Sequence, residues 1–373
     1  MQGSPRGNIA FTAVVTVLVC LGALPVLLVL ALSGAPSSLL LATVLAALPV
    51  GPLVACYLWL DRYEPEPRRL LALGLLWGGF VATAAALLVQ GIGGWVVGFS
   101  ESASLAIVAP VTEELTKGLF LVLLLWWRRH EFDGILDGIV YAGMVGIGFA
   151  FVENILYLAA AYNGTSGETP GGTAALTSVF VVRCLFSPFA HPLFTTFTGI
   201  GIGIAVGSRS RAVRILAPIA GYVVAVVAHA IWNGSTLLGF AGFLGAYVVL
   251  MAPAFVGLVA LAVWIRRSEK RMLTASLTDA AQRGLIPATD IGWLVSLRAR
   301  RASRAHALHH GGLQAQRAMR DYQQAAVELG FLHHRFLRGT PPPDFAVRGQ
   351  VYVERIAAAR PFVVFPGQVV PSR

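Results

Sequence analysis

The stretch IVAPVTEELTKGLFLVLLLWW, from Ile107 to Trp127, has the length and apolarity of a membrane-spanning helix. Yet Glu113, Glu114 and Lys117 lie near its middle. A charged side chain at the centre of a bilayer costs about 2.5–3.5 kcal/mol on insertion scales, so such residues face a bundle interior or a water-filled cavity. The spacing lets Lys117 pair with either carboxylate, three or four residues away on the same helix face. The stretch therefore predicts a membrane protein with a buried polar site.

The composition of the whole chain is that of a protein that lies mostly in lipid. Of its 373 residues, 56% are hydrophobic and 12% are charged, whereas soluble domains carry about 25% charged residues. A net charge of +10 would indicate nucleic acid in a soluble protein, but membrane proteins collect Lys and Arg in their cytoplasmic loops. We therefore expect the lipid bilayer as a partner and no nucleic acid. The cysteines show neither a disulfide framework nor a metal-binding spacing.

Runs of about 20 apolar residues, the length that crosses a bilayer as a helix, recur along the first 265 residues. They predict an all-α polytopic membrane protein whose transmembrane domain, residues 1–265, has about eight helices. The expected spans are 9–33, 38–60, 70–97, 104–127, 135–161, 177–206, 215–237 and 240–265. From residue 266 to 373 the chain is rich in Arg, Ala, Gln and His, which indicates a basic, partly helical C-terminal tail.

The loops between the predicted spans separate into two classes by charge. Alternate loops contain the basic residues Arg62, Arg68, Arg69, Arg128, Arg129, Arg209, Arg211, Arg214, Arg266, Arg267, Lys270 and Arg271. The intervening loops, GAPSS, SESAS, NGTSGETPGG and the turn after Asn233, contain no Lys or Arg. Because basic loops stay in the cytoplasm, we expect both termini to be cytoplasmic and the protein to lie in the cell membrane.

Polar residues recur inside four of the predicted spans. Besides those of the opening stretch, they are Glu153, Asn154, Arg183, His191, His229 and Asn233. Glu113, Glu153 and His229 each lie about eight to ten residues below the outer end of their spans, a depth of roughly 12–15 Å. His191 reaches the same depth if the membrane part of its long span begins near Arg183. Four helices are thus predicted to converge on one polar layer in the outer half of the bilayer.

The residue types in this layer fit hydrolytic chemistry at a metal ion. Imidazole and carboxylate are ligands of catalytic zinc, which usually takes three protein ligands and keeps one position open for water. A further Glu can act as a general base, and an amide can hydrogen-bond a developing oxyanion. No Ser occurs in a G-x-S-x-G context, so a serine hydrolase is not expected. Taken singly, Arg183, Thr195 and Asp137 are expected to be structural, and tail histidines such as His309 to be solvated.

The order of these motifs resembles the PrsW family of intramembrane proteases. The matching blocks are Glu113-Glu114-x-x-Lys117, Phe149-x-x-x-Glu153-Asn154, His191 with Thr195 and Gly199, and His229-x-x-Trp232-Asn233. The resemblance covers roughly residues 113 to 233 and leaves out the tail. It implies endopeptidase cleavage of membrane-anchored protein substrates in a bacterial plasma membrane. It also implies a regulatory role, the first-site cleavage of an anti-sigma factor.

The expected roles of the site residues follow from the motifs and the resemblance together. We expect Glu113 or Glu114 to activate water and Lys117 to balance their charge, while Asn233 supports the oxyanion. The expected ligands of a Zn²⁺ cofactor are Glu153, His191 and His229. A metal-free Glu/His mechanism, considered for the wider group of CAAX-processing membrane proteases, stays open. So do a proton- or cation-coupled transporter that uses the same buried carboxylates and a non-catalytic membrane scaffold.

Overall fold

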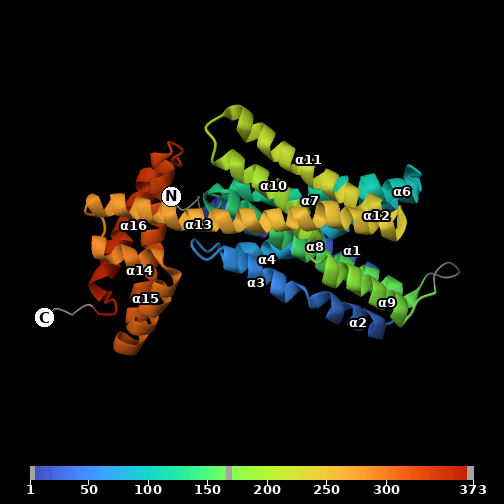
Figure 1. Cartoon of the computed structure of the whole chain (residues 1–373), viewed down its shortest axis with the longest axis horizontal. Helices are drawn as coiled ribbons and strands as arrows, with labels where there is room; N and C mark the ends of the chain where they lie inside the picture. Colours follow the sequence, from blue (N-terminus) through green and yellow to red (C-terminus); the bar gives the residue numbers. More distant parts are fainter. Residues whose placement is uncertain (1–4, 165–169, 368–373) are drawn as a thin grey trace. The chain divides into compact units, whose positions relative to one another are not determined.

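The computed structural model describes residues 5–164 and 170–367, and all regular secondary structure in these two ranges is helical (Figure 1). This confirms the predicted all-α class. The chain divides into two compact units. The membrane unit comprises residues 3–61 and 66–262, and the C-terminal unit comprises residues 62–65 together with the chain from residue 263 onward.

The membrane unit consists of helices joined by short turns, because its apolar runs are interrupted by Gly, Pro and Arg. Four of its segments, η1, η2, η4 and η5, are π-helical, a wider turn that often occurs at functional sites. Its elements are α1 (Pro5–Leu32), α2 (Pro36–Ala47), α3 (Val50–Leu60), α4 (Arg68–Leu76), η1 (Trp77–Ala82), α5 (Thr83–Val96), α6 (Glu101–Ala103), η2 (Ser104–Val108), α7 (Ala109–Trp127), the 3-10 turn η3 (Arg129–Glu131), α8 (Ile135–Asn163), α9 (Thr173–Phe180), η4 (Val181–Phe186), α10 (Ala190–Val206), α11 (Arg211–Thr236), α12 (Gly239–Ala246), η5 (Tyr247–Met251) and the first part of α13 (Ala252–Gln282).

Seven helical segments of the described residues are long and apolar enough to cross a membrane. They are Ile9–Leu32, Pro36–Leu60, Arg68–Gly93, Ile135–Asn163, Thr173–Val206, Arg211–Thr236 and Gly239–Gln282. They correspond to seven of the eight predicted spans, so the polytopic architecture is confirmed. The remaining predicted span, residues 104–127, is also helical, through η2 and α7. It is not among the seven apolar segments because it contains three charged residues near its middle.

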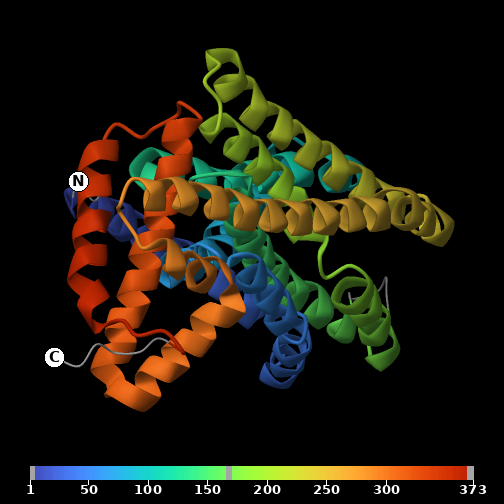
Figure 2. The same cartoon turned by 60° about the vertical axis from the view of Figure 1, so that its left-hand side comes forward.

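Helix α8 is the most buried of these seven segments and packs against α10, α4 and η1 (Figure 2). Glycines permit this close approach. A Cβ atom on Gly138 would lie 2.1 Å from the carbonyl oxygen of Gly199, and one on Gly146 would lie 2.6 Å from the backbone of Pro192. Small residues let two helix backbones approach closely inside a membrane. Because the backbone of Pro192 contacts Gly146, the preceding residue, His191, also lies against α8.

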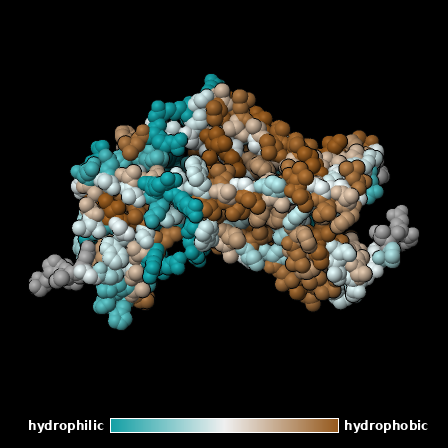
Figure 3. Space-filling view, viewed as in Figure 1, coloured by the Kyte–Doolittle hydropathy of each residue, from teal (hydrophilic) through white to brown (hydrophobic). Residues whose placement is uncertain are grey.

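Away from the contacts with α8, the surface of the membrane unit is apolar. Its exposed side chains include Leu21, Leu24, Leu28, Leu88, Ile92, Leu216, Ile219, Val223 and Val249. Figure 3 shows hydrophobic residues over much of the visible surface of these helices. Apolar surface of this extent is stable in contact with lipid rather than water. The chain is therefore a multi-pass membrane protein.

The C-terminal unit has a hydrophobic core of its own, so most of the predicted tail is a folded helical body. Its elements are the end of α13, η6 (Ala288–Asp290), α14 (Ile291–Val295), α15 (Leu297–Leu337), α16 (Phe345–Ala359) and η7 (Arg360–Phe362). Helix α15 turns at Gly312, whose φ of +67° favours glycine, and it packs against α16 (Figure 2). Tyr322 and Phe365 are fully buried in this core.

The short segment 62–65 joins α3 to α4 but belongs to the C-terminal unit. The ring of Tyr63 is part of the same hydrophobic core as Tyr322. Its carbonyl oxygen accepts a hydrogen bond from Nη1 of Arg300 (3.1 Å). The core of this unit is therefore built from two stretches that are far apart in the sequence.

Asp61, which follows the last turn of α3, makes the stability of the protein depend on pH. Burial raises the pKa of Asp61 to about 8, although the backbone N–H of Glu66 donates to its carboxylate (2.8 Å) and favours the charged form. In the unfolded chain the pKa is about 3.9. The folded state thus binds the proton more tightly, so the contribution of Asp61 to stability is fully present below about pH 4 and is lost as the pH rises through about 8.

Asp61→Asn should remove this loss of stability, because the amide stays neutral and can still accept the hydrogen bond from Glu66. The measurement is the midpoint of thermal unfolding in detergent at about pH 5 and about pH 8, for the wild type and the variant. The midpoint of the variant should change less between the two conditions. An equal change in both proteins would show that Asp61 is ionised in the folded state.

Candidate active site

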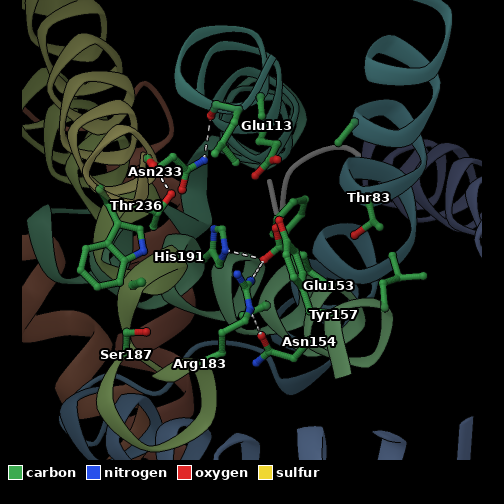
Figure 4. Close-up of a pocket in the computed structure, with 18 of the residues that line it drawn as sticks. Thr83, Glu113, Glu153, Asn154, Tyr157, Arg183, Ser187, His191, Asn233 and Thr236 are labelled. Carbon is green, nitrogen blue, oxygen red and sulfur yellow. Dashed lines mark hydrogen bonds and ion pairs between the residues drawn. The ribbon is translucent and has the colours of Figure 1, made fainter. Parts of the chain in front are cut away.

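A cavity of about 620 Å³ lies inside the membrane unit. Helices α5, α7, α8, α10 and α11 and the segment η4 all contribute side chains to its wall. The charged and amide groups among them are those of Gln90, Glu101, Glu113, Glu153, Asn154, Arg183, His191 and Asn233. Figure 4 labels Glu113, Glu153, Asn154, Arg183, His191 and Asn233 among these, and they come from α7, α8, η4, α10 and α11. Part of the wall is aromatic, formed by Phe149, Tyr157, Trp232 and Phe243.

Helix α7 buries its two carboxylates and its lysine together, because residues three and four apart share one helix face. Lys117 is fully buried, and its Nζ lies 2.9 Å from Oε1 of Glu114 and 3.3 Å from Oε2 of Glu113. The ammonium also lies 3.6 Å from the centre of the Phe149 ring, a cation–π contact. The ammonium of Lys117 therefore partly compensates the charges of the two carboxylates inside this predicted span. Of the two carboxylates, Glu113 lines the cavity.

Glu114 is fully buried and both of its oxygens accept hydrogen bonds. Oε1 accepts from Lys117 and lies 3.0 Å from Nδ1 of His229, and Oε2 accepts from the hydroxyl of Thr195 (3.0 Å). A carboxylate beside one ring nitrogen fixes the tautomer and the orientation of an imidazole. His229 therefore carries its proton on Nδ1. Its other nitrogen, Nε2, lies 3.9 Å from Oε2 of Glu113.

Glu153 on α8 holds His191 in the same manner. Nε2 of His191 lies 2.7 Å from Oε2 of Glu153, and the same oxygen accepts a hydrogen bond from Nη2 of Arg183 (Figure 4). Arg183 in turn donates from Nε to Oδ1 of Asn154 (2.8 Å). The second ring nitrogen of His191, Nδ1, lies 3.1 Å from Nζ of Lys117. His191 thus points one nitrogen at Glu153 and the other at the cluster on α7.

Glu113, His191 and His229 form a group that could hold a metal ion, since their ligand atoms all lie within 4.8 Å of one another. The hydrogen bonds described above leave Nδ1 of His191 and Nε2 of His229 as the ring atoms that face Glu113 and Lys117. One carboxylate and two imidazoles are a donor set of catalytic zinc sites. The residues therefore fit a metal ion. Because Lys117 contacts His191 and Glu113, its ammonium and a metal ion compete for the same atoms.

This donor set differs from the expected one at a single residue. The sequence predicts Glu153 as a ligand, whereas in the structure its Oε2 is occupied by His191 and Arg183. The structure groups Glu113 with the two histidines instead. Arg183, expected to be structural, forms an ion pair with Glu153 at the cavity wall. Asn233 lines the cavity and donates one amide hydrogen to the carbonyl oxygen of Leu105 on η2 (3.1 Å).

Gln90 is not among the site residues predicted from the sequence, although it lines the cavity and contacts Glu113. Gln90 lies near the C-terminal end of the third span, on α5, among apolar residues and glycines. Its side chain is uncharged, and no recognised motif contains it. The available signal was the presence of an amide inside an apolar span, where polar groups are costly.

Comparison with known proteins gives a consistent result. The model of the PrsW family intramembrane metalloproteases matches residues 66–258, just over half of the chain. The chain is 31% identical to "Protease PrsW" of Geobacillus kaustophilus over 161 residues, which are 43% of this chain and 65% of that protein. Over 155 residues it is 28% identical to "Protease PrsW" of Oceanobacillus iheyensis, 41% of this chain and 62% of the relative. The chain thus spans just under two thirds of these relatives. No solved structure matches it.

Proposed function

This chain belongs to the PrsW family of intramembrane metalloproteases, and from that premise we propose that it is an endopeptidase acting on membrane-anchored protein substrates. One observation supports this most directly. The buried group of Glu113, His191 and His229 adjoins a cavity whose wall also contains Glu153 and Asn233. The cavity thus combines a metal-donor set, a further carboxylate and an amide, which are the parts that peptide hydrolysis needs.

We propose Zn²⁺ as the metal, which Glu113, His191 and His229 would hold. When bound, zinc lowers the pKa of a water molecule to about 7 and polarises a carbonyl group. Glu114 and Glu153 keep the two imidazoles in position through the hydrogen bonds to His229 and His191. Outer partners of this kind set the orientation and basicity of metal-binding histidines.

The remaining steps of hydrolysis are assigned to side chains of the cavity wall. Glu153 lines the cavity, and its hydrogen bonds use Oε2, so Oε1 is available to take a proton from water. The water oxygen bonds to the carbonyl carbon, and the second amide hydrogen of Asn233 donates to the oxyanion. The carbon–nitrogen bond then breaks, and Glu153 returns the proton to the leaving amine. The sequence alone predicts water activation by Glu113 or Glu114, so this proposal moves the role of the base to Glu153.

The proposed orientation places the C-terminal unit in the cytoplasm and opens the site towards the outer half of the bilayer. Its support is the segregation of Arg and Lys into alternate loops. An impermeant thiol reagent applied to intact cells should leave a cysteine at Ser268 unlabelled, and labelling there would reverse the orientation. We propose a membrane-anchored anti-sigma factor as the substrate, cleaved at its first site.

Glu153→Gln tests the assignment of the base. The variant keeps the size of the side chain and loses its basicity, so we expect cleavage of a tagged single-span substrate to fall by about 10²–10⁴-fold. In buffer with excess zinc, its zinc content should equal that of the wild type, because the three proposed donors are intact and the excess offsets a weaker hold on His191. Glu354→Gln makes the same chemical change on the exposed surface of the C-terminal unit and serves as the control. Unchanged cleavage by a well-folded Glu153→Gln protein would exclude Glu153 as the base.

A further inference from the structure

We infer that Gln90 is a positioning residue of the metal centre, which orients Glu113 in the way that Glu114 and Glu153 orient the two histidines. The inference rests on the proposed zinc site. It extends that site to α5, a helix that carries none of the motif residues. Gln90 acts through Glu113 and is not assigned a contact with the reacting atoms.

The Gln90 amide contacts Oε1 of Glu113, the carboxylate oxygen that is not directed at Lys117 and His229. Gln90 lines the cavity, and its Nε2 donates a hydrogen bond to Oε1 of Glu113 (3.3 Å). The other carboxylate oxygen, Oε2, faces Lys117 at 3.3 Å and Nε2 of His229 at 3.9 Å. The two oxygens of Glu113 are therefore directed to opposite partners. This fixes the rotation of the carboxylate plane and presents Oε2 to the site.

With Gln90 included, every proposed donor has one atom held and another directed into the centre. His191 is held at Nε2 by Glu153 (2.7 Å), and His229 is held at Nδ1 by Glu114 (3.0 Å). Glu113 is held at Oε1 by Gln90. Such partners fix ligand geometry, and their replacement typically costs 10–100-fold in metal affinity or activity.

The position of Gln90 in the chain supports a specific role over simple packing. It lies inside the third span, next to the exposed side chains of Leu88 and Val89. An amide in this environment needs a partner, because an unpaired polar group in lipid is costly. A purely structural hydrogen bond between α5 and α7 would stabilise the fold without affecting the metal. Loss of the amide therefore lowers zinc affinity if Gln90 positions Glu113, and it lowers the stability of the fold if the hydrogen bond is only structural.

The test compares Gln90→Met with Val89→Met in the full-length protein in detergent. Methionine has a similar length but cannot donate to Glu113, and Val89 is an exposed neighbour on the same helix. Zinc affinity is measured by competition with a chelator at one pH. We expect Gln90→Met to bind zinc 10–100-fold more weakly than Val89→Met. We also expect kcat to fall with little change in KM, while the unfolding midpoints of the two metal-free variants agree.

Each result bears on the inference. Equal zinc affinity of Gln90→Met and Val89→Met, in a wild type that binds one zinc, would overturn the role of Gln90 and leave the metal centre in place. A lower unfolding midpoint with unchanged zinc affinity would show a structural hydrogen bond instead. A wild-type protein that retains no zinc yet cleaves substrate would overturn the metal centre and this inference together. Gln90→Asn, whose shorter amide falls short of Glu113, should resemble Gln90→Met in zinc affinity.

Discussion

Replacing His229 by Ala is expected to lower the rate of substrate cleavage by at least about 10³-fold, because the groups of such a site act as a unit. His229 is almost fully buried and belongs to the donor group with Glu113 and His191. Glu114→Gln should lower cleavage by about 10–100-fold, because it removes the carboxylate that accepts from Nδ1 of His229 (3.0 Å) and orients that ring. Both variants should still insert into the membrane.

The measurement is cleavage of a tagged single-span substrate, read beside the immunoblot level of each variant. Val227→Ala is the matched control, since Val227 is an exposed residue of the same helix, α11. It should cleave as the wild type does. Normal cleavage by well-expressed His229→Ala and Glu114→Gln proteins would refute the protease proposal. The buried carboxylates would then favour a transporter that relays protons or binds a cation.

Replacing Lys117 by Met is expected to destabilise the protein by about 3–5 kcal/mol, the usual cost of leaving a buried charge without its partner. Lys117 is fully buried and contacts both Glu113 and Glu114. Without the ammonium, the two buried carboxylates keep the imidazoles, the Thr195 hydroxyl and the Gln90 amide as polar neighbours but lose their cationic partner. The variant should accumulate poorly and unfold at a lower temperature.

The double variant Lys117→Met with Glu114→Gln separates this charge effect from lost packing. Neutralising Glu114 removes one of the two uncompensated charges, so abundance and unfolding temperature should partly recover while cleavage stays well below the wild-type rate. The measurements are membrane-fraction immunoblots and thermal unfolding in detergent. If Lys117→Met alone accumulates normally and unfolds at the wild-type temperature, the lysine is not the counter-charge of the pair.

The fold class could be predicted from the sequence because apolar runs of sufficient length can satisfy their backbone in lipid only as helices. The span of residues 104–127 shows the limit of that signal. Its three charged residues lower its mean hydropathy. The contacts of Lys117 with Glu113, Glu114 and His191 explain how this helix can lie inside the membrane unit. The segment 62–65 was beyond prediction, since Tyr63 packs with residues more than 200 positions later. No local pattern encodes such a contact.

The candidate site was predictable as a set of residues but not as a set of roles. Buried charges at similar depth pointed to Glu113, Glu153 and His229 as neighbours. Adjacent residues on a helix point in different directions, so only tertiary packing distinguishes Glu113, which lines the cavity, from Glu114, which holds His229. The position of Glu153 depends on Arg183, 30 residues away on η4. The site residues named from the sequence stay a prediction until variants are assayed.

The membership of residues 62–65 in the C-terminal unit has a consequence for synthesis of the protein on the ribosome. This segment emerges about 300 residues before residue 367, the end of the described core. At about 5–20 residues per second, Tyr63 waits roughly 15–60 s for the helices that cover it. During that interval two spans on either side of the segment are already available for insertion. The core of the C-terminal unit can therefore be completed only after Phe365 has been synthesised, although one of its pieces, Tyr63, is made among the first.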